Sequence, residues 1–496
     1  MTPNEPCTNC GFASAPPDAC DQTELHFFPH HLSGSNEPPT DLETLHLEKA
    51  LAQKRVLISD LDDKIAALQS KIAEYQRLRQ SAALQIQRDT AILSAVRRIP
   101  HDVLLEIFAW TVPDDARMKH VHATHRCPWV LGHVCSRWRA ISVGSPKLWT
   151  HIDRRLPLGM IKAQLDRSLP HPLTVELGFS DKGRVELLIA CSSRWEAADI
   201  EMRGLMGPAL AAVQGQLPLL RRLKYHDNNG FRLFGAFSSA PVLRDVSLSG
   251  RASVVLPWSQ VKRLNLKLLD STILNPLEEA QNIEELSVTG RPLGQLPSPG
   301  AMELSCLRKL LIKNGVFLDS LILPALNDLY VSMDLTSVPS LIHRSNCHLT
   351  RFTTDVQCMS ADILTILELT PSLVDLRISA IQDVKVLLSR LTINNSSSEL
   401  TAYTRPLVPA LRALVVTNVS DPSACTQLVA MMESRRASTP VCAEVSLCVF
   451  DFIKWSALGL YATDTRDKLR GMGFNVEWLT GPQAMDRYRS WRPGYP

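Results

Sequence analysis

The chain has 496 residues, which is more than one hydrophobic core usually supports, so we expect several domains or an array of repeats. Apolar residues make up 45% of the chain, enough for a sizeable core. With 53 basic and 50 acidic residues the formal net charge is only +3, so neither nucleic acid nor an anionic membrane is expected as a partner.

Targeting signals and cysteine usage favour a reducing compartment. No run of about 18 apolar residues occurs, so no membrane span is expected. The opening MTPNEPCTNC does not have the basic and then apolar segments of a secretory signal. The 12 cysteines are scattered mostly within apolar stretches, as buried free thiols would be. These features predict a protein of the cytoplasm, the nucleus or both.

Residues 1–40 form an acidic, proline-rich segment without Lys or Arg, which we expect to be mostly disordered because it cannot bury enough apolar surface to fold. Cys7 and Cys10 have the CxxC spacing of many zinc sites, and Cys20 and His26 could complete four ligands. The second half of such a site has no firm spacing. We therefore expect no metal or other cofactor, and these four side chains remain weak zinc candidates.

Residues 41–96 contain neither Pro nor Gly and show the heptad pattern of a coiled-coil helix. Ile recurs at the a positions and Leu occupies two d positions, a choice that favours a parallel two-stranded coiled coil. We therefore expect self-association through residues 47–93, although Lys54, Arg79 and Asp89 interrupt the seam. Two alternatives stay open: packing of the helix within its own chain, and a single solvated helix.

Residues 97–150 predict a compact helical block with more apolar surface than so short a segment buries by itself. The stretch RRIPHDVLLEIFAWTVP predicts a first helix that starts at Ile99 and Pro100, since proline is tolerated in the first turn. A loop over 113–128 leads to WVLGHVCSRWRAISVGSPKLW, which predicts a second helix. Because so few residues are near the limit for a self-sufficient core, part of this surface is expected to face a partner.

This block resembles the F-box family in two segments that occur in the family's order. RRIPHDVLLEIF is similar to the opening Leu-Pro-x-x-[IVL]-Leu-x-x-[IVL]-Phe segment, although Ile99 stands where Leu is usual. VCSRWRAISVGSPKLW is similar to the closing segment, in which Val-Cys-x-x-Trp precedes Leu-Trp. The loop between the two segments is longer than usual and leaves the middle of the motif unmatched. The resemblance implies a three-helix domain over 97–150.

The resemblance also implies a role in ubiquitin transfer. F-box domains dock on the small adaptor of a cullin-RING ubiquitin ligase, and the downstream repeats hold a protein substrate, here unknown. The adaptor-binding residues implied for this chain are Ile99, Pro100, Leu104, Ile107, Phe108, Val134, Cys135 and Trp138. The alternative for each of them is a place in the core of the block.

Residues 151–480 predict a leucine-rich-repeat-like solenoid with a parallel sheet. The pattern L-x-x-L-x-L or a close variant starts nine times between 220 and 411, mostly 18 to 24 residues apart, and a degenerate copy starts at 442. Each copy predicts a short strand whose first, fourth and sixth residues face inward. The copies must stack, because one copy cannot bury its apolar side alone. Residues 481–496 are expected to form a tail.

In the first eight copies the residue just before the fourth position carries a charge, and the sign of that charge alternates from one copy to the next. In a parallel sheet such positions lie about 4.8 Å apart, so the alternation predicts a ladder of cross-strand ion pairs that fixes register. The functional alternative is that this polar face receives a protein substrate. An alternating stripe does not suit nucleic acid, which needs a continuous basic track. The eight residues are Arg222, Asp245, Arg263, Glu285, Lys309, Asp328, Arg351 and Asp375.

No motif in the sequence supports catalysis. A glycine-rich phosphate loop, HExxH and GxSxG are all missing. We therefore expect a non-enzymatic α/β protein with a long N-terminal helix, the F-box-like block and the repeat array. The first hypothesis is a substrate receptor of a ubiquitin ligase. The second is a repeat scaffold or coiled-coil adaptor without a ligase link, and the third is an unrecognised hydrolase or transferase.

Overall fold

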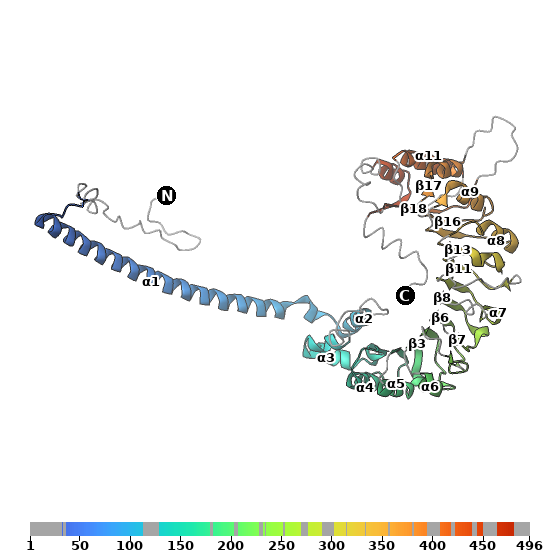
Figure 1. Ribbon diagram of the computed structural model, residues 1–496, viewed down its shortest axis with the longest axis horizontal. Helices are drawn as coiled ribbons and strands as arrows, with labels where there is room; N and C mark the ends of the chain where they lie inside the picture. Colours follow the sequence, from blue (N-terminus) through green and yellow to red (C-terminus); the bar gives the residue numbers. More distant parts are fainter. Residues whose placement is uncertain are drawn as a thin grey trace. The chain divides into compact units, whose positions relative to one another are not determined.

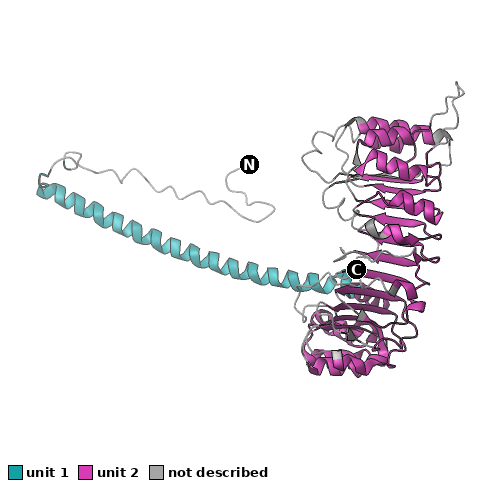
Figure 2. Ribbon diagram, turned by 45° about the vertical axis from the view of Figure 1, so that its right-hand side comes forward, with its two compact units in different colours: residues 1–100 teal, residues 101–496 magenta. Residues whose placement is uncertain are grey.

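The computed structural model divides the chain into two compact units, Met1–Pro100 and His101–Pro496 (Figure 2). The described residues are Leu32 and 36–112, 128–178, 182–202, 207–227, 232–233, 235–250, 253–268, 276–289, 302–313, 315–332, 334–355, 358–378, 381–393, 407–417, 422–438, 444–449 and 464–480. Among the helices in these ranges, none combines the length and the apolar character needed to cross a bilayer.

The first unit contains one long helix, α1 (Asp41–Leu93), as the heptad pattern predicts. The helix begins at Asp41 because Thr40 caps it: the N–H of Thr40 donates to Oε2 of Glu43 at 2.8 Å, and the N–H of Glu43 donates to the Thr40 hydroxyl at 3.4 Å. The short helix η2 (Ala95–Arg98) follows, and Ile99 is extended, as expected before a proline. No residue of α1 is buried. The long helix is confirmed, and its partner stays a prediction.

The second unit opens with a helical block whose second half differs from the prediction. Its elements are α2 (His101–Thr111), η5 (Trp129–His133), α3 (Ser136–Val143) and η6 (Pro146–Trp149). A single second helix was predicted, and this is wrong. Cys135 is extended, with φ −160° and ψ 170°, and its sulfur accepts the N–H of Trp138 at 3.4 Å. The thiol therefore starts a new helix in place of continuing the first one.

The rest of the second unit is built on one open, parallel sheet of 14 strands, among the described residues. The strands lie side by side in chain order, with each main strand pairing with the next one. They are β1 (His151–Ile152), β2 (Leu173–Gly178), β3 (Trp195–Met202), β4 (Arg222–Asp227), β6 (Asp245–Gly250), β8 (Arg263–Leu268), β9 (Glu285–Val288), β11 (Lys309–Ile312), β13 (Asp328–Val331), β14 (Arg351–Thr354), β16 (Asp375–Ile378), β18 (Ala413–Thr417), β19 (Glu444–Val449) and β20 (Asn475–Thr480).

The segments between these strands cross one side of the sheet, where Figure 1 shows the helices of this unit. The helices are α4 (Leu158–Arg167), α5 (Lys182–Ile189), α6 (Gly207–Leu210), α7 (Pro276–Glu279), α8 (Val338–Ser345), α9 (Ser360–Glu368), α10 (Val384–Leu391) and α11 (Pro422–Ser438). Three small two-stranded sheets lie in the same crossing segments: β5 (Arg232–Leu233) with β7 (Ser253–Val254), β10 (Met302–Glu303) with β12 (Leu321–Ile322), and β15 (Cys358–Met359) with β17 (Ile381–Gln382). The chain is therefore an α/β protein. Among the described residues, the face of the 14-stranded sheet opposite the crossing segments carries no helix (Figure 1).

The core lies between the sheet and the crossing segments, and the inward positions are those that the pattern predicts. In the copy that starts at 220, the first, fourth and sixth residues are Leu220, Leu223 and Tyr225, and each is at most 1% exposed. The eight later copies up to residue 416 bury the same three positions. Each buried leucine contributes about 1.5–3 kcal/mol relative to an exposed one, so this repeated set is a large contribution to the apolar stabilisation.

Buried arginines tie successive crossing segments together. The side chain of Arg435 on α11 is 1% exposed and donates to the carbonyls of Leu391 (2.9 Å), Leu407 (2.7 Å) and Val408 (3.0 Å). Arg344 on α8 makes a similar link to the preceding crossing segment, where its guanidinium donates to the carbonyl of Leu318 at 2.7 Å. These carbonyls have no strand partner, and the fork of guanidinium donors satisfies them.

Candidate functional site

An exposed apolar surface lies on the helical block. Val103, Ile107 and Trp110 occupy one side of α2 and are 44%, 41% and 82% exposed. Their spacing of three and four residues places them on one helical face, which we call the α2 face. Val134, at the junction of η5 and α3, is 57% exposed as well. A block of this size therefore leaves large apolar side chains in solvent, as the sequence predicts.

The eight predicted adaptor-binding residues divide between surface and core. Leu104 and Phe108 are buried, and the Phe108 ring lies 4.8 Å from that of Trp138, so both serve to pack α2 against α3. Trp138 is half-buried, whereas Ile107, Val134 and Cys135 are exposed. The remaining two, Ile99 (half-buried) and Pro100 (exposed), belong to the first unit. The structure thus leaves Ile107, Val134 and Cys135 as the exposed members of the set within the second unit.

Another part of the block is covered by its own chain, which the sequence did not indicate. The Arg167 guanidinium of α4 lies 5.0 Å from the Trp129 ring and 4.4 Å from the Trp149 ring. Trp149 is 2% exposed, and its ring N–H donates to the carbonyl of Ser142 at 2.7 Å. Part of the apolar surface that was expected to face a partner is therefore buried against the first crossing helix of the sheet.

The predicted charge ladder forms in the expected register on the helix-free face of the sheet. The backbone pairing aligns each of the eight charged residues with the next, from Arg222 opposite Asp245 to Arg351 opposite Asp375. Lys309 pairs with Glu285 at 2.9 Å. The Arg351 guanidinium bridges two carboxylates, Asp328 at 3.0 Å and Asp375 at 2.9 Å, and Arg263 pairs with Asp245. The alternation therefore produces cross-strand ion pairs.

Burial and pairing act in opposite directions on the ladder's carboxylates. Burial raises the pKa of Asp328 above its ordinary value, although the nearby Arg351 opposes the effect. For Arg263 the hydrogen bond with Asp245 outweighs burial and raises the pKa of the guanidinium. The ladder is thus partly desolvated and keeps its charges because each carboxylate has a cation beside it.

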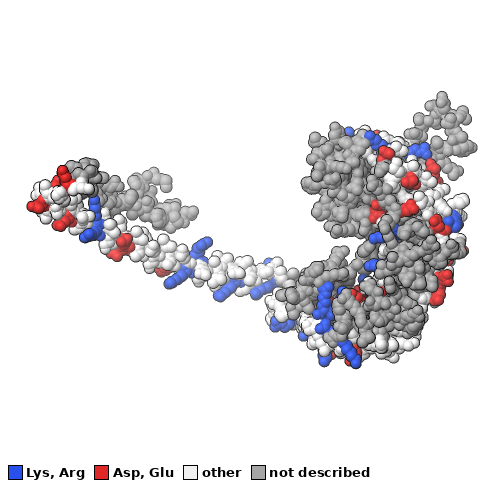
Figure 3. All heavy atoms as spheres, viewed as in Figure 1, with Lys and Arg blue, Asp and Glu red and all other residues white. Residues whose placement is uncertain are grey.

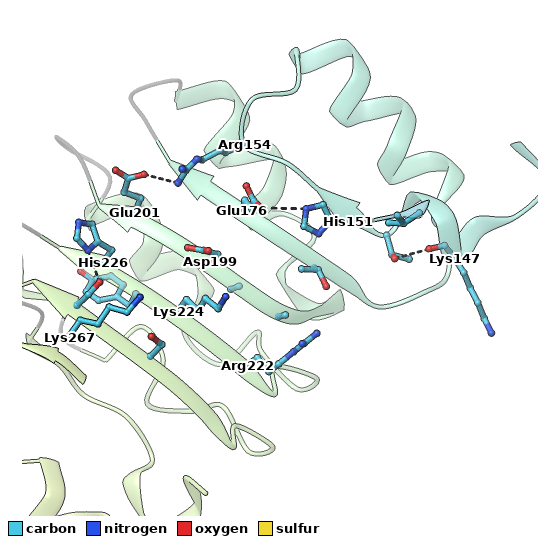
Figure 4. Close-up of a pocket in the computed structure, with 18 of the residues that line it drawn as sticks. Lys147, His151, Arg154, Glu176, Asp199, Glu201, Arg222, Lys224, His226 and Lys267 are labelled. Carbon is cyan, nitrogen blue, oxygen red and sulfur yellow. Dashed lines mark hydrogen bonds and ion pairs between the residues drawn. The ribbon is translucent and has the colours of Figure 1, made fainter. Parts of the chain in front are cut away.

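A polar pocket of about 610 Å³ lies on the same face, where strands β1 to β8 follow the helical block (Figure 4). Among the described residues that line it, Glu176 pairs with His151 at 3.4 Å and Glu201 pairs with Arg154 at 2.6 Å. Burial would raise the pKa of Glu176, but the hydrogen bond and charge of His151 together with nearby Arg154 outweigh it, so the pKa is lowered. Glu176 and Glu201 are therefore each neutralised by a basic side chain of the same pocket. No sequence motif marked the pocket, because its residues come from six strands.

The third carboxylate of the pocket, Asp199, has a different balance. Burial raises its pKa, and Lys224 on the neighbouring strand opposes that effect only in part. The two residues occupy paired positions on β3 and β4. The ionised form of Asp199 is therefore less favourable in the folded chain than in the unfolded one.

No metal centre emerges from the described residues, since no group of three or more possible metal ligands lies together there. The weak zinc candidates Cys7, Cys10, Cys20 and His26 fall outside the described residues. The six cysteines whose side chains the structure describes are thiols and not disulfides.

Comparisons with known proteins add no assignment: no family model matches the chain, and no curated protein matches its sequence.

Proposed function

We propose that the protein is the substrate-recognition subunit of a cullin-RING ubiquitin ligase. In this proposal residues 97–150 are an F-box that docks the ligase adaptor, and residues 151–480 form a leucine-rich-repeat-like solenoid that holds the substrate. The protein itself performs no bond chemistry, and it acts by bringing substrate and ubiquitin-loaded enzyme together. Such a role belongs to the cytoplasm or the nucleus.

The observation that carries the proposal is the exposure of the α2 face and of Val134 on the same helical block. The block buries Leu104 and Phe108 and packs Trp129 and Trp149 against Arg167 of α4, yet it leaves Ile107, Trp110 and Val134 in solvent. Exposed aromatic and aliphatic side chains of this density are typical of an interaction surface. Ile107 and Val134 lie in the two segments that resemble the F-box motif, and Trp110 follows the first segment by two residues, which is why we assign the adaptor to this surface.

The solenoid interpretation rests on three features of the sheet. Strand order equals chain order, each copy buries the same three positions, and the crossing segments keep to one side. Each strand with its crossing segment therefore contacts mainly the strands and segments next to it, as in repeat proteins. The exposed face of the sheet is then the place where a substrate would bind.

Co-purification tests the adaptor assignment. We expect the full chain to retain the adaptor, and Ile107→Asp together with Val134→Asp to lose it. Val386→Asp, at a 48% exposed valine on α10, is the matched control and should retain it. Retention by the double variant, or no retention by the unaltered chain, would sink the proposal. Leu104→Ala is unsuitable because Leu104 is 1% exposed, and its truncation would cost about 2–5 kcal/mol of stability.

The second candidate function, a coiled-coil scaffold, is favoured by one observation on α1. None of its 53 residues is buried, although Ile58, Leu61 and Ile65 continue the heptad seam. A heptad seam is buried only when a second helix packs against it, so we propose self-association through residues 47–93. Figure 3 shows acidic side chains near the Asp41 end and basic ones further along, so charge alone does not select a parallel pair. Sedimentation equilibrium of the full chain should give a dimer, and a strict monomer would remove this candidate.

A further inference from the structure

The ladder leaves one cation without a carboxylate where it begins, at β4. Arg222 is aligned with Ala197 on β3 and with Asp245 on β6. Asp245 is already held by Arg263, whose Nε donates to one carboxylate oxygen at 2.7 Å while a terminal nitrogen donates to the other. Ala197 carries no charge. Within the part of the chain that the structure describes, the exposed Arg222 therefore has no acidic partner.

Arg222 projects into the pocket described above together with Lys224, from the same strand and the same face. Figure 4 shows Arg222 at the end of the pocket away from the Arg154–Glu201 pair, with no labelled carboxylate beside it. Five Lys or Arg and three Asp or Glu side chains are among the described lining residues, and two of the three carboxylates are already paired. The charge that remains is positive, so the pocket complements an anion.

A narrower cavity continues from this pocket along the same face. It has a volume of about 210 Å³, shares Arg222, Lys224 and Ser247 with the first, and reaches across the strands to β13. Asn265 lines it, and the buried Oδ1 of Asn265 has no hydrogen-bond partner among the described residues. A buried acceptor of this kind is costly unless a ligand supplies an N–H. The two cavities together suit a chain-like ligand with backbone N–H groups.

We infer that this face binds an extended acidic segment of a protein partner, with carboxylates on alternate residues that pair with Arg222 and Lys224. The two cations stand two residues apart on one strand, about 6.6 Å, and an extended peptide repeats its side chains on one face at the same interval. The inference names the substrate class of the proposed receptor and so rests on that proposal. The evidence for the partner's chemistry is the charge complementarity and the orphaned acceptor.

The test uses the purified full chain and a fluorescein-labelled peptide, Gly-Ser-Glu-Ser-Glu-Ser-Glu-Ser-Gly, followed by fluorescence anisotropy. We expect saturable binding that weakens as salt rises, and no binding of the same peptide with Gln at each Glu. Inorganic phosphate and an RNA oligomer are the competing anions. If either binds the pocket more tightly than the acidic peptide does, or if the Gln peptide binds equally well, the inference is wrong.

Two sets of variants locate the binding. Arg222→Gln with Lys224→Gln should weaken peptide binding about tenfold, since each exposed ion pair contributes only a few-fold. Lys162→Gln with Arg308→Gln removes the same charge from exposed positions outside both cavities and should change nothing. Equal weakening in both pairs would show general charge attraction and contradict a site.

The sharper pair of variants supplies the carboxylate that the ladder lacks. Ala197 lies opposite Arg222, so Ala197→Asp should occupy Arg222 internally, add a repelling carboxylate and weaken peptide binding about tenfold, while the near-isosteric Ala197→Asn should leave it within about threefold. If both variants bind alike, Arg222 is not the anchor. Circular dichroism confirms that each variant is folded. Adaptor retention is measured separately on the unaltered chain. Adaptor retention without peptide binding by that chain would reject this inference alone, and peptide binding without adaptor retention would reject the ligase role alone.

Discussion

Helix α1 and the long sheet both follow a regular apolar pattern, yet they bury it very differently. In α1 the seam side chains such as Leu61 and Ile65 are 47% and 52% exposed, whereas Leu329 on β13 is fully buried. The strands stack on copies of themselves within one chain, so each copy covers the next. A single helix has no copy of itself beside it. The same kind of pattern therefore predicts an internal core in one region and an external partner in the other.

The largest effect is expected where a buried arginine holds the crossing segments together. Arg435→Met removes the guanidinium donor from the carbonyls of Leu391 and Leu407 and one of two donors from that of Val408, and the free energy of unfolding should fall by about 4 kcal/mol. Arg390→Met is the control, because Arg390 is 54% exposed and pairs only with an exposed Glu368 among the described contacts. Urea unfolding followed by circular dichroism measures both. An unfolding curve for Arg435→Met that coincides with that of the control would show that the arginine link is dispensable.

A matched pair of leucine truncations tests the comparison directly. Leu329→Ala removes a fully buried side chain from β13 and should cost about 3 kcal/mol, while Leu61→Ala on α1 should leave the unfolding of the second unit unchanged. Leu61→Ala should instead weaken self-association. The measurement is thermal unfolding together with sedimentation equilibrium. A large loss of stability from Leu61→Ala at monomer concentrations would mean that α1 packs within its own chain.

The charge ladder offers a smaller, salt-dependent effect. Asp328→Lys places a third cation between Lys309 and Arg351, its two neighbours in the ladder, and should cost about 1 kcal/mol at low ionic strength. Asp328→Asn removes the ion pair without adding repulsion and should cost less. The difference in unfolding free energy between the two variants should shrink as salt is added. If it does not change with salt, the ladder does not act through charge.

Asp199 should give the smallest effect, with a defined pH dependence. Its pKa is raised by burial, so the ionised form is less favourable in the folded chain than in the unfolded one. Its negative charge therefore lowers stability at neutral pH, and the loss is recovered as pH falls toward the ordinary pKa of about 4. Asp199→Asn should raise stability at pH 7 by less than about 1 kcal/mol and have no effect below pH 4. A stabilisation that persists unchanged at pH 3 would contradict this account.

The sequence predicted those features that depend on a local period. The heptad run without Pro or Gly over residues 41–96 predicted α1, and the L-x-x-L-x-L pattern predicted both the inward residues and the register of the ladder. Features that depend on competition between neighbours were missed. Asp245 had two cations in register, Arg222 and Arg263, and only the structure shows that Arg263 holds it. No local pattern decides such a choice.

The helical block shows the same limit at a smaller scale. Its apolar residues were identified correctly as a group, but their division into core and surface depends on Cys135, which interrupts the second helix, and on Arg167, which stacks on two tryptophans from a later helix. Neither contact leaves a periodic signal. Leu104 and Phe108 were therefore expected at a partner surface and lie instead inside the block.

The central proposal is that the α2 face and Val134 serve a ligase adaptor. The most direct measurement is a calorimetric titration of the purified full chain with the purified adaptor, repeated on the Ile107→Asp and Val134→Asp double variant. The proposal predicts saturable one-to-one binding by the unaltered chain and a loss of at least about a hundredfold in affinity for the double variant, as for the centre of an interface. Absence of binding by the unaltered chain, or equal binding by both proteins, would contradict it.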